Sequence, residues 1–170
     1  MTISMYEASI PVFVQLLGNL KTFLEKGAAH AAARKFDPAV LVNSRLAPDM
    51  FPLSRQIQIA SDAAKGAAAR LSGTEAPKFE DKETTLPELI ARIDKTVDYL
   101  KSFTPAQIDG SEERSVVVKT SQRDFSFTGL TYLRYWALPN FFFHVTTTYN
   151  LLRHNGVELG KADFLGPIEK

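Results

Sequence analysis

The segment MFPLSRQIQIASDAAKGAAARL, residues 50–71, decides the fold class. Its apolar residues recur at alternating steps of three and four, at Met50, Leu53, Ile57, Ala60, Ala64, Ala67 and Leu71. Residues with this spacing lie along one face of an α-helix. Several of these positions are alanine, and small side chains let a neighbouring helix approach closely. The segment therefore predicts a long helix that packs along its whole length.

Three further segments have the same kind of apolar stripe. The first begins with capping-box spacing at Ser4 and Glu7, and we expect it to end at Gly27. Another begins with a capping box at Thr85 and Glu88, and the last ends at Asn155-Gly156. Their stripes are Tyr6, Ile10, Phe13, Leu17, Leu20 and Leu24; Leu86, Ile90, Ile93, Val97 and Leu100; and Phe142, Val145, Tyr149 and Leu152.

Two short segments between the third and fourth helices favour strands. Residues 116–118 are three consecutive valines, and Phe125 and Phe127 alternate with polar residues after a polar turn. We therefore predict a small β-hairpin inserted before the last long helix. Four helices with apolar stripes bury them most simply as a four-helix bundle. The predicted fold is all-α, with one domain over residues 1–170.

Composition excludes several classes of protein. Lys and Arg number 20 and Asp and Glu 19, which leaves a net charge of +1 and no basic excess for nucleic acid. No apolar stretch is long enough for a membrane span, and the first 20 residues lack the basic start of a signal peptide. Cysteine is absent, so thiolate chemistry is excluded. We expect a cytoplasmic protein without nucleic-acid or membrane partners.

His144 is the main candidate for chemistry. It lies beside the apolar stripe of the last helix, with Asn140 one turn before it and Thr148 one turn after it. Gln58 and Asp62, one turn apart on the helix of residues 50–71, could face it, and Gln56 is a further candidate. One interpretation is a core histidine with its hydrogen bonds satisfied. The other is a polar pocket in the bundle that binds a small molecule or a metal.

The aromatic run at 141–143 bears on self-association. Consecutive helical residues point in different directions, so Phe141, Phe142 and Phe143 cannot all face one core. We expect one of them to pack on the hairpin or on another subunit, which favours a homodimer.

Three motifs indicate a family. They are the segments LAPDMFPL (46–53), LPNFFFH (138–144) and LRHNGVELGKADFLG (152–166). Through them the chain resembles the DinB/YfiT-like superfamily of helical-bundle metalloenzymes, and more closely an uncharacterised branch of it, a domain family of unknown function. The resemblance implies an up-down-down-up bundle, often dimeric. It also implies a divalent metal held by one histidine of the second helix and two histidines four residues apart on the fourth.

Only one position of this chain matches those ligands. His144 resembles one member of the pair, and the other position is then Asn140 or Thr148, while residues 50–71 contain no histidine. An amide or hydroxyl is a poor ligand for zinc or nickel. We therefore expect no metal or other cofactor. A small-ligand-binding bundle, a metal-dependent transferase using His144 with Gln58 or Asp62, and a structural or dimerisation protein are the three functions that remain open.

Overall fold

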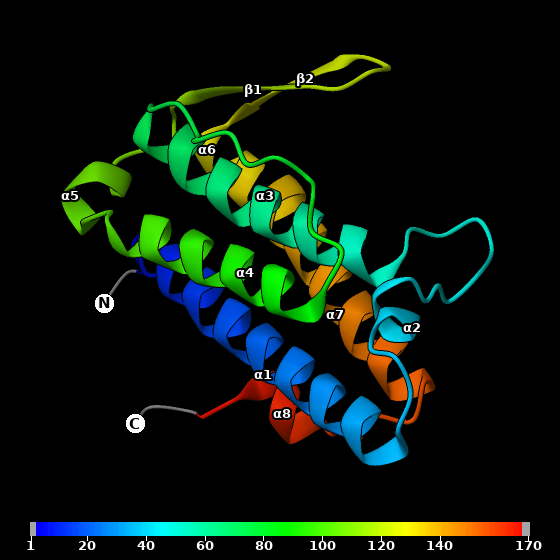
Figure 1. The fold of residues 1–170 in the computed structure, drawn as a ribbon. Helices are drawn as coiled ribbons and strands as arrows, with labels where there is room; N and C mark the ends of the chain where they lie inside the picture. Colours follow the sequence, from blue (N-terminus) through cyan, green and yellow to red (C-terminus); the bar gives the residue numbers. More distant parts are fainter. Residues whose placement is uncertain (1–2, 168–170) are drawn as a thin grey trace.

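A computed structural model describes residues 3–167 and shows a four-helix bundle (Figure 1). Its long helices are α1 (Ile10–Arg34), α3 (Leu53–Ser72), α4 (Leu86–Lys101) and α7 (Leu138–His154). Helices α1 and α3 each pack against both α4 and α7, so they occupy opposite corners. Helices α1 and α7 run in one direction, and α3 and α4 run in the other. The predicted up-down-down-up bundle is confirmed.

The core is built from the predicted stripes, except that on α7 Phe141 is buried and the predicted Phe142 is 37% exposed. From Leu53 to Leu71 every residue of the α3 stripe is fully buried, and so are Phe13 and Leu17 of α1. Phe13 meets Phe141 of α7 edge to face, with ring centroids 4.9 Å apart. The alanines of α3 allow close contact with α7, the helix against which it packs most extensively.

Helix α1 both begins and ends later than predicted, since it starts at Ile10 and not at the Ser4 capping box. It continues through Gly27 to Arg34 and ends where Lys35 adopts a left-handed conformation with φ 57°. Gly27 is a site of close packing rather than a stop, because a Cβ there would lie 3.3 Å from the Leu152 side chain. The short helix α2 (Ala39–Val42) follows, with the Asp37 carboxylate accepting from the Ala39 amide at 2.8 Å.

The parallel arrangement of α3 and α4 requires a long return connection. The 20 residues of α3 span about 30 Å, and the chain must cross that length again before α4 can start on the same side. Residues 74–84 do so without regular secondary structure, and we call them the strap. The strap ends at the predicted capping box, in which the Thr85 amide donates to the Glu88 carboxylate at 3.0 Å. The Thr84 amide also donates to this carboxylate, at 2.8 Å, and the hydrogen bonds from Thr84 and Thr85 lower the pKa of Glu88.

The predicted hairpin is also confirmed. After α5 (Pro105–Ile108), strand β1 (Ser115–Lys119) pairs antiparallel with β2 (Asp124–Thr128). Val116 and Val118 are buried, and the rings of Phe125 and Phe127 pack against Trp136, with centroids 4.9 and 5.8 Å apart. The hairpin is therefore held by its inward face at one end of α7.

The last helical run begins earlier than the fourth predicted helix. Helix α6 (Gly129–Tyr132) leads without a break into the π-helical segment η1 (Leu133–Ala137) and then into α7. Pro139 therefore lies inside a continuous helical run, where it removes one backbone donor, and the π-helical segment η1 ends two residues before it. The chain then forms α8 (Lys161–Leu165), a short helix that the sequence pattern did not predict. None of the helices described over residues 3–167 is long and apolar enough to cross a membrane.

Candidate functional site

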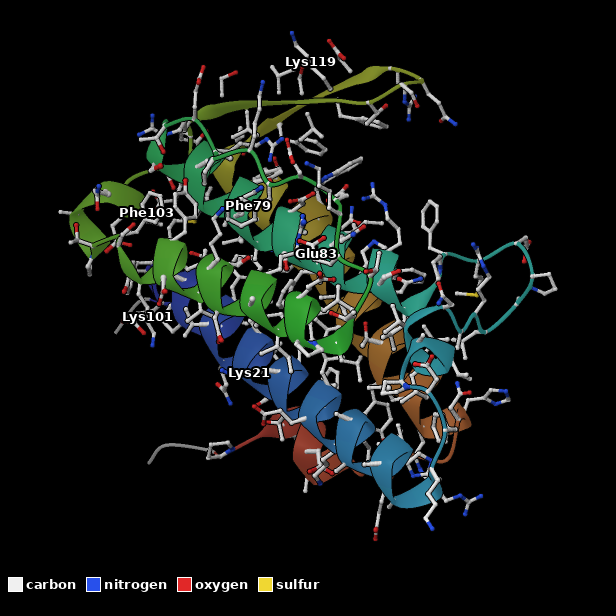
Figure 2. The ribbon with its side chains drawn as sticks, viewed as in Figure 1. Lys21, Phe79, Glu83, Lys101, Phe103 and Lys119 are labelled. Atoms are coloured by element: carbon white, nitrogen blue, oxygen red, sulfur yellow. The ribbon has the colours of Figure 1, made fainter. Side chains whose placement is uncertain are left out.

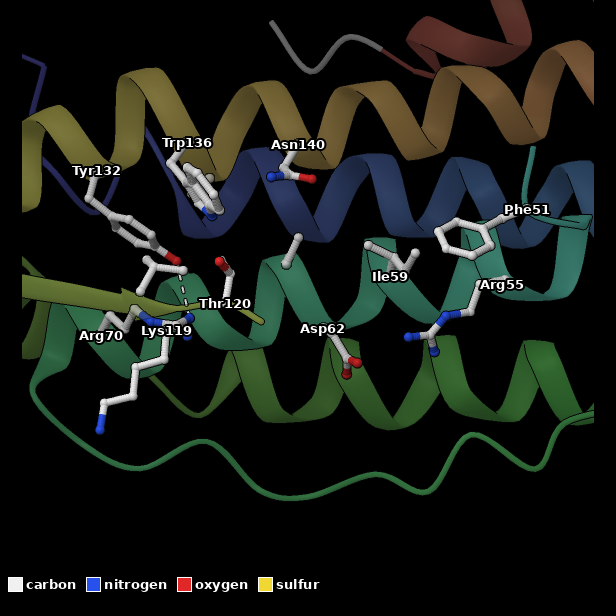
Figure 3. Close-up of a pocket in the computed structure, with 13 residues that line it drawn as sticks. Phe51, Arg55, Ile59, Asp62, Arg70, Lys119, Thr120, Tyr132, Trp136 and Asn140 are labelled. Carbon is white, nitrogen blue, oxygen red and sulfur yellow. Dashed lines mark hydrogen bonds between the residues drawn. The ribbon is translucent and has the colours of Figure 1, made fainter. Parts of the chain in front are cut away.

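A groove of about 670 Å³ opens between α3, the hairpin and the segment from α6 to the start of α7 (Figure 3). Its apolar wall includes Phe51, Ile59, Ala63, Val118 and Trp136. Its polar lining comprises Arg55, Asp62, Arg70, Lys119, Thr120, Tyr132 and Asn140. Small-molecule sites have this character: a concave, largely apolar surface of several hundred Å³ with a few convergent polar groups.

Helical spacing explains how these side chains meet. Tyr132, Trp136 and Asn140 follow one another at steps of four, so they lie along one face of the last helical run. Arg55, Ile59 and Ala63 repeat the same step on α3, on the side away from its buried stripe. The hairpin adds Val118 and Lys119 as a third wall.

Positive charge gathers at the hairpin end of the groove. The Arg70 Nη1 donates to the Tyr132 hydroxyl at 3.3 Å, and its guanidinium carbon lies 5.7 Å from the centre of that ring. Burial raises the pKa of Tyr132, an effect that the Arg70 charge opposes. Within residues 3–167 no carboxylate forms an ion pair with Arg70 or Lys119.

His144 lies just beyond the opposite end of the groove and is paired with Gln56. Its Nδ1 is 2.7 Å from the Gln56 Oε1, and the Gln56 amide donates to the Phe51 carbonyl at 3.1 Å. Since Oε1 is an acceptor, Nδ1 carries the hydrogen and Nε2 is unprotonated in the neutral ring. Both side chains are buried, with His144 8% and Gln56 1% exposed.

The environment keeps this imidazole neutral. Burial, helped by the nearby Arg55 charge, lowers the pKa of His144 from 6.5 to about 4. No hydrogen bond to His144 Nε2 occurs within the described part of the chain, and Nε2 is not among its fully enclosed, unpartnered atoms. The ring therefore offers a neutral acceptor that solvent can reach.

The other predicted site residues separate into two places. Asn140 lines the groove, one turn before His144. Thr148 is fully buried, and its hydroxyl donates to the His144 backbone carbonyl at 2.9 Å, so it serves its own helix. Neither residue contributes a group that binds the imidazole.

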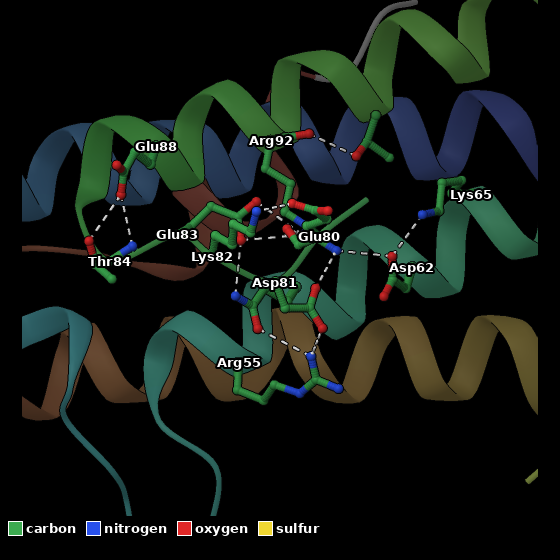
Figure 4. Close-up of polar contacts among 12 residues, drawn as sticks. Arg55, Asp62, Lys65, Glu80, Asp81, Lys82, Glu83, Thr84, Glu88 and Arg92 are labelled. Carbon is green, nitrogen blue, oxygen red and sulfur yellow. Dashed lines mark hydrogen bonds and ion pairs between the residues drawn. The ribbon is translucent and has the colours of Figure 1, made fainter. Parts of the chain in front are cut away.

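Gln58 and Asp62 belong to a cluster of charges under the strap, shown in Figure 4. Gln58 donates to Glu83 at 3.0 Å and accepts from Arg55 at 3.2 Å. Asp62 pairs with Arg92 and with Lys65, both at 3.0 Å. Asp62 also borders the groove, but Gln58 faces away from it. The predicted grouping of Gln58 with His144 is not present, and Gln56 takes that place.

These residues do not fit the metal centre implied by the family resemblance. His144 Nδ1 is occupied by Gln56, and the position one turn before it is an amide. The Asp62 carboxylate is engaged by two cations. Within the described residues, no group of three or more His, Asp or Glu side chains could hold an ion. Zinc and nickel prefer imidazole or thiolate donors, and one imidazole does not make such a site.

Comparison with known proteins agrees with the resemblance. A family model described as a domain of unknown function (DUF1993) matches residues 5–165. Among solved structures, the chain is similar to a DinB family member protein from Shewanella denitrificans, with 42% sequence identity and a TM-score of 0.89. That match covers 97% of this chain and 93% of the other. No curated protein matches the chain significantly.

The bundle topology and the groove beside its α3–α7 pair therefore define a DinB-like helical-bundle protein. Within that class the chain belongs to the DUF1993 family.

Proposed function

We propose that this protein binds a small molecule in the groove between α3, the hairpin and α7, and that it does so without the three-histidine metal centre of its superfamily. The observation that supports this most directly is the groove itself, with about 670 Å³ of space and a largely apolar lining. A volume in this range suits a ligand of metabolite size. Polar side chains lie at both ends and in the middle of the groove, where they can orient such a ligand.

His144 suits a binding role better than a catalytic one. An imidazole whose pKa is about 4 stays neutral at physiological pH and is a weak base. Its unprotonated Nε2 can accept a hydrogen bond, and the Gln56 contact holds the ring in one orientation. Asn140, one turn away, adds an amide that both donates and accepts. We propose that these two side chains bind a hydroxyl or amine at that end of the ligand.

The sole tryptophan offers a direct test, because Trp136 lines the groove. The uncharged fluorescent probe N-phenyl-1-naphthylamine should bind and quench Trp136 emission by energy transfer. Ala63→Phe, which fills the groove from α3, should abolish that quenching. Ala32→Phe, on the exposed face of α1, is the matched control and should bind as the wild type does. Equal quenching in both variants would rule out this groove as the site.

A second proposal concerns self-association. The α7 face that points to solvent is aromatic, with Tyr135 66%, Phe143 55% and Phe142 37% exposed, whereas Phe141 is buried. Apolar side chains grouped on one surface are typical of interfaces. We propose a homodimer through this face. Light scattering after gel filtration should give twice the chain mass, and Phe143→Glu should shift it to the monomer. A monomeric wild type at micromolar concentration would refute the dimer.

Composition supports a proposal about the cellular setting. A chain without cysteine is suited to a reducing compartment and needs no disulfide for stability. We propose that ligand binding takes place in the cytoplasm, which cell fractionation with an antibody against the protein would test.

A further inference from the structure

We infer that the ligand of this groove is an organic anion: a flat apolar body with a carboxylate, phosphate or similar oxyanion bound at the Arg70 end. This inference rests on the proposed function and specifies its ligand class. It follows from how charge is distributed in the lining, from how Arg70 is held, and from what lies between the two polar ends.

The charges of the lining differ in whether they have partners. Arg55 pairs with Asp81 of the strap, and Asp62 pairs through Oδ1 with Arg92 and Lys65. Arg70 and Lys119 pair with no carboxylate in the part of the chain that the structure describes. Even Asp124, the strand neighbour of Lys119, forms no ion pair with it. The groove therefore has an uncompensated positive end, although the whole chain has a net charge of only +1.

Arg70 is positioned before any ligand arrives. Its guanidinium folds back along α3 against Gly66, where a Cβ would collide with Nη1. The Tyr132 hydroxyl accepts from the same nitrogen at 3.3 Å, and the other N–H groups of the fork have no hydrogen-bond partner among the described residues. A fixed planar fork is well suited to an oxyanion, since it forms parallel charge-assisted hydrogen bonds with little loss of side-chain freedom.

The middle of the groove has an apolar wall beside the polar side chains of Asp62, Thr120 and Asn140. Trp136 and Ile59 border it, and Trp136 is held from behind by Phe125, with ring centroids 4.9 Å apart. Figure 3 shows Trp136 between Tyr132 and Asn140, with Arg70 beside Tyr132 and Phe51 at the far end. A ligand with an aromatic or other flat apolar body fits this wall, because stacking on an aromatic face favours flat groups.

A matched pair of probes separates charge from shape. 8-Anilinonaphthalene-1-sulfonate carries a sulfonate that N-phenyl-1-naphthylamine lacks, and the two are otherwise the same molecule. Titrations followed by Trp136 quenching should show the sulfonate binding about tenfold more tightly, as one charged hydrogen-bonded contact provides. Added sodium chloride should weaken the binding of the sulfonate probe and leave the affinity of the neutral probe unchanged. Equal affinity for both probes at low salt would overturn the inference.

Two variants test the residues that carry it. Arg70→Met should remove most of the tenfold preference and leave the neutral probe bound. Because Arg70 also packs on Tyr132, a second variant guards against misfolding: Lys119→Gln changes an exposed strand residue and should reduce the preference about threefold. Lys101→Gln is the control, since Lys101 lies at the end of α4, away from the groove (Figure 2). A preference unchanged in both groove variants would show that the charge is not recognised here.

The outcomes distinguish this inference from the proposed function. If neither probe binds, or if Ala63→Phe changes nothing, then the groove is not a binding site and the proposed function fails. If both probes bind and Ala63→Phe blocks their binding, but the sulfonate binds no more tightly than the neutral probe, then only the ligand class is wrong. Benzoate and phenyl phosphate should displace the sulfonate, and whichever does so at lower concentration identifies the oxyanion. Equal displacement by benzyl alcohol would contradict an anionic ligand.

Discussion

Helix α3 has two polar sides, and they differ in whether their arginines form ion pairs with carboxylates. Towards α4 it meets the strap, where Arg92, with a side chain only 1% exposed, pairs with Asp62, Asp81 and Glu83, each at 3.0 Å. Towards α7 and the hairpin it borders the groove, where Arg70 has a hydroxyl partner and, within residues 3–167, no carboxylate partner. The strap covers the first side, whereas the second side remains open as the groove.

The difference separates structural charges from charges available for binding. A buried arginine stabilises a fold only when its charge and its N–H groups are matched, as they largely are at Arg92. Phe79 of the strap lies over the same cluster, with the Lys65 and Lys95 amines 4.0 and 4.2 Å from its ring centre. A cation left without an anion in a concave site gains no such stabilisation from the fold. It is available to a ligand instead.

The largest expected effect comes from giving the groove side a metal centre. Gln56→His combined with Asn140→His would place two further imidazoles beside His144, from the facing helix and from one turn earlier. Three imidazoles suit zinc, and we expect about one equivalent bound with micromolar or tighter affinity, about 8 kcal/mol. Metal analysis after dialysis measures it. The wild type should retain far less than one equivalent, and stoichiometric zinc there would support the metal-dependent alternative.

Next in size is the loss of Arg92. Replacing it by Met leaves three carboxylates without their common partner, and we expect the free energy of unfolding to fall by about 3 kcal/mol. Urea denaturation followed by circular dichroism measures the change. Lys101→Met at the exposed end of α4 is the control and should change stability by less than about 0.5 kcal/mol. If Arg92→Met lowers the free energy of unfolding as little as the control does, then the ion pairs of Arg92 do not hold the strap.

A third prediction uses pH. The pKa of His144 is about 4 in the folded protein, below its usual 6.5, so the unfolded chain takes up the proton first as pH falls. The contribution of His144 therefore leaves the free energy of unfolding unchanged above pH 6.5. Between pH 6.5 and 4 it lowers that free energy, by about 2 kcal/mol at pH 5. His144→Gln should remove that part of the pH dependence. His154→Gln, at the end of α7, should leave it unchanged.

The smallest effect is expected for the groove cations themselves. Lys119→Gln should change the free energy of unfolding by less than about 0.5 kcal/mol, because no partner is lost. Thermal unfolding in parallel with the binding titrations checks this. A loss above 1 kcal/mol would show that Lys119 has a structural role after all, and the contrast between the two sides of α3 would weaken.

Local patterns predicted the fold well, and the site only in part. Periodicity located the four helices, the hairpin and the capping box at Thr85, because each depends on neighbours in sequence. Gly27 was misread as a stop, because its role depends on the distant Leu152. Helical spacing indicated His144 and Asn140 as candidates, and of these Asn140 lines the groove. The groove was not identified, since its walls come from three segments whose approach no local pattern encodes, although the four-residue steps from Tyr132 to Asn140 were a usable signal.

The placement of α1 and α3 at opposite corners has a consequence for how the chain folds. The most extensive helix contacts, α3 with α7 and α1 with α4, join segments that are not consecutive in sequence. In an up-down-up-down bundle, each helix can pack against the helix that precedes it in the sequence. Here large loops must close before much apolar surface is buried, and closing them costs chain entropy in advance. The protein should therefore reach its native state more slowly than simpler bundles of equal length.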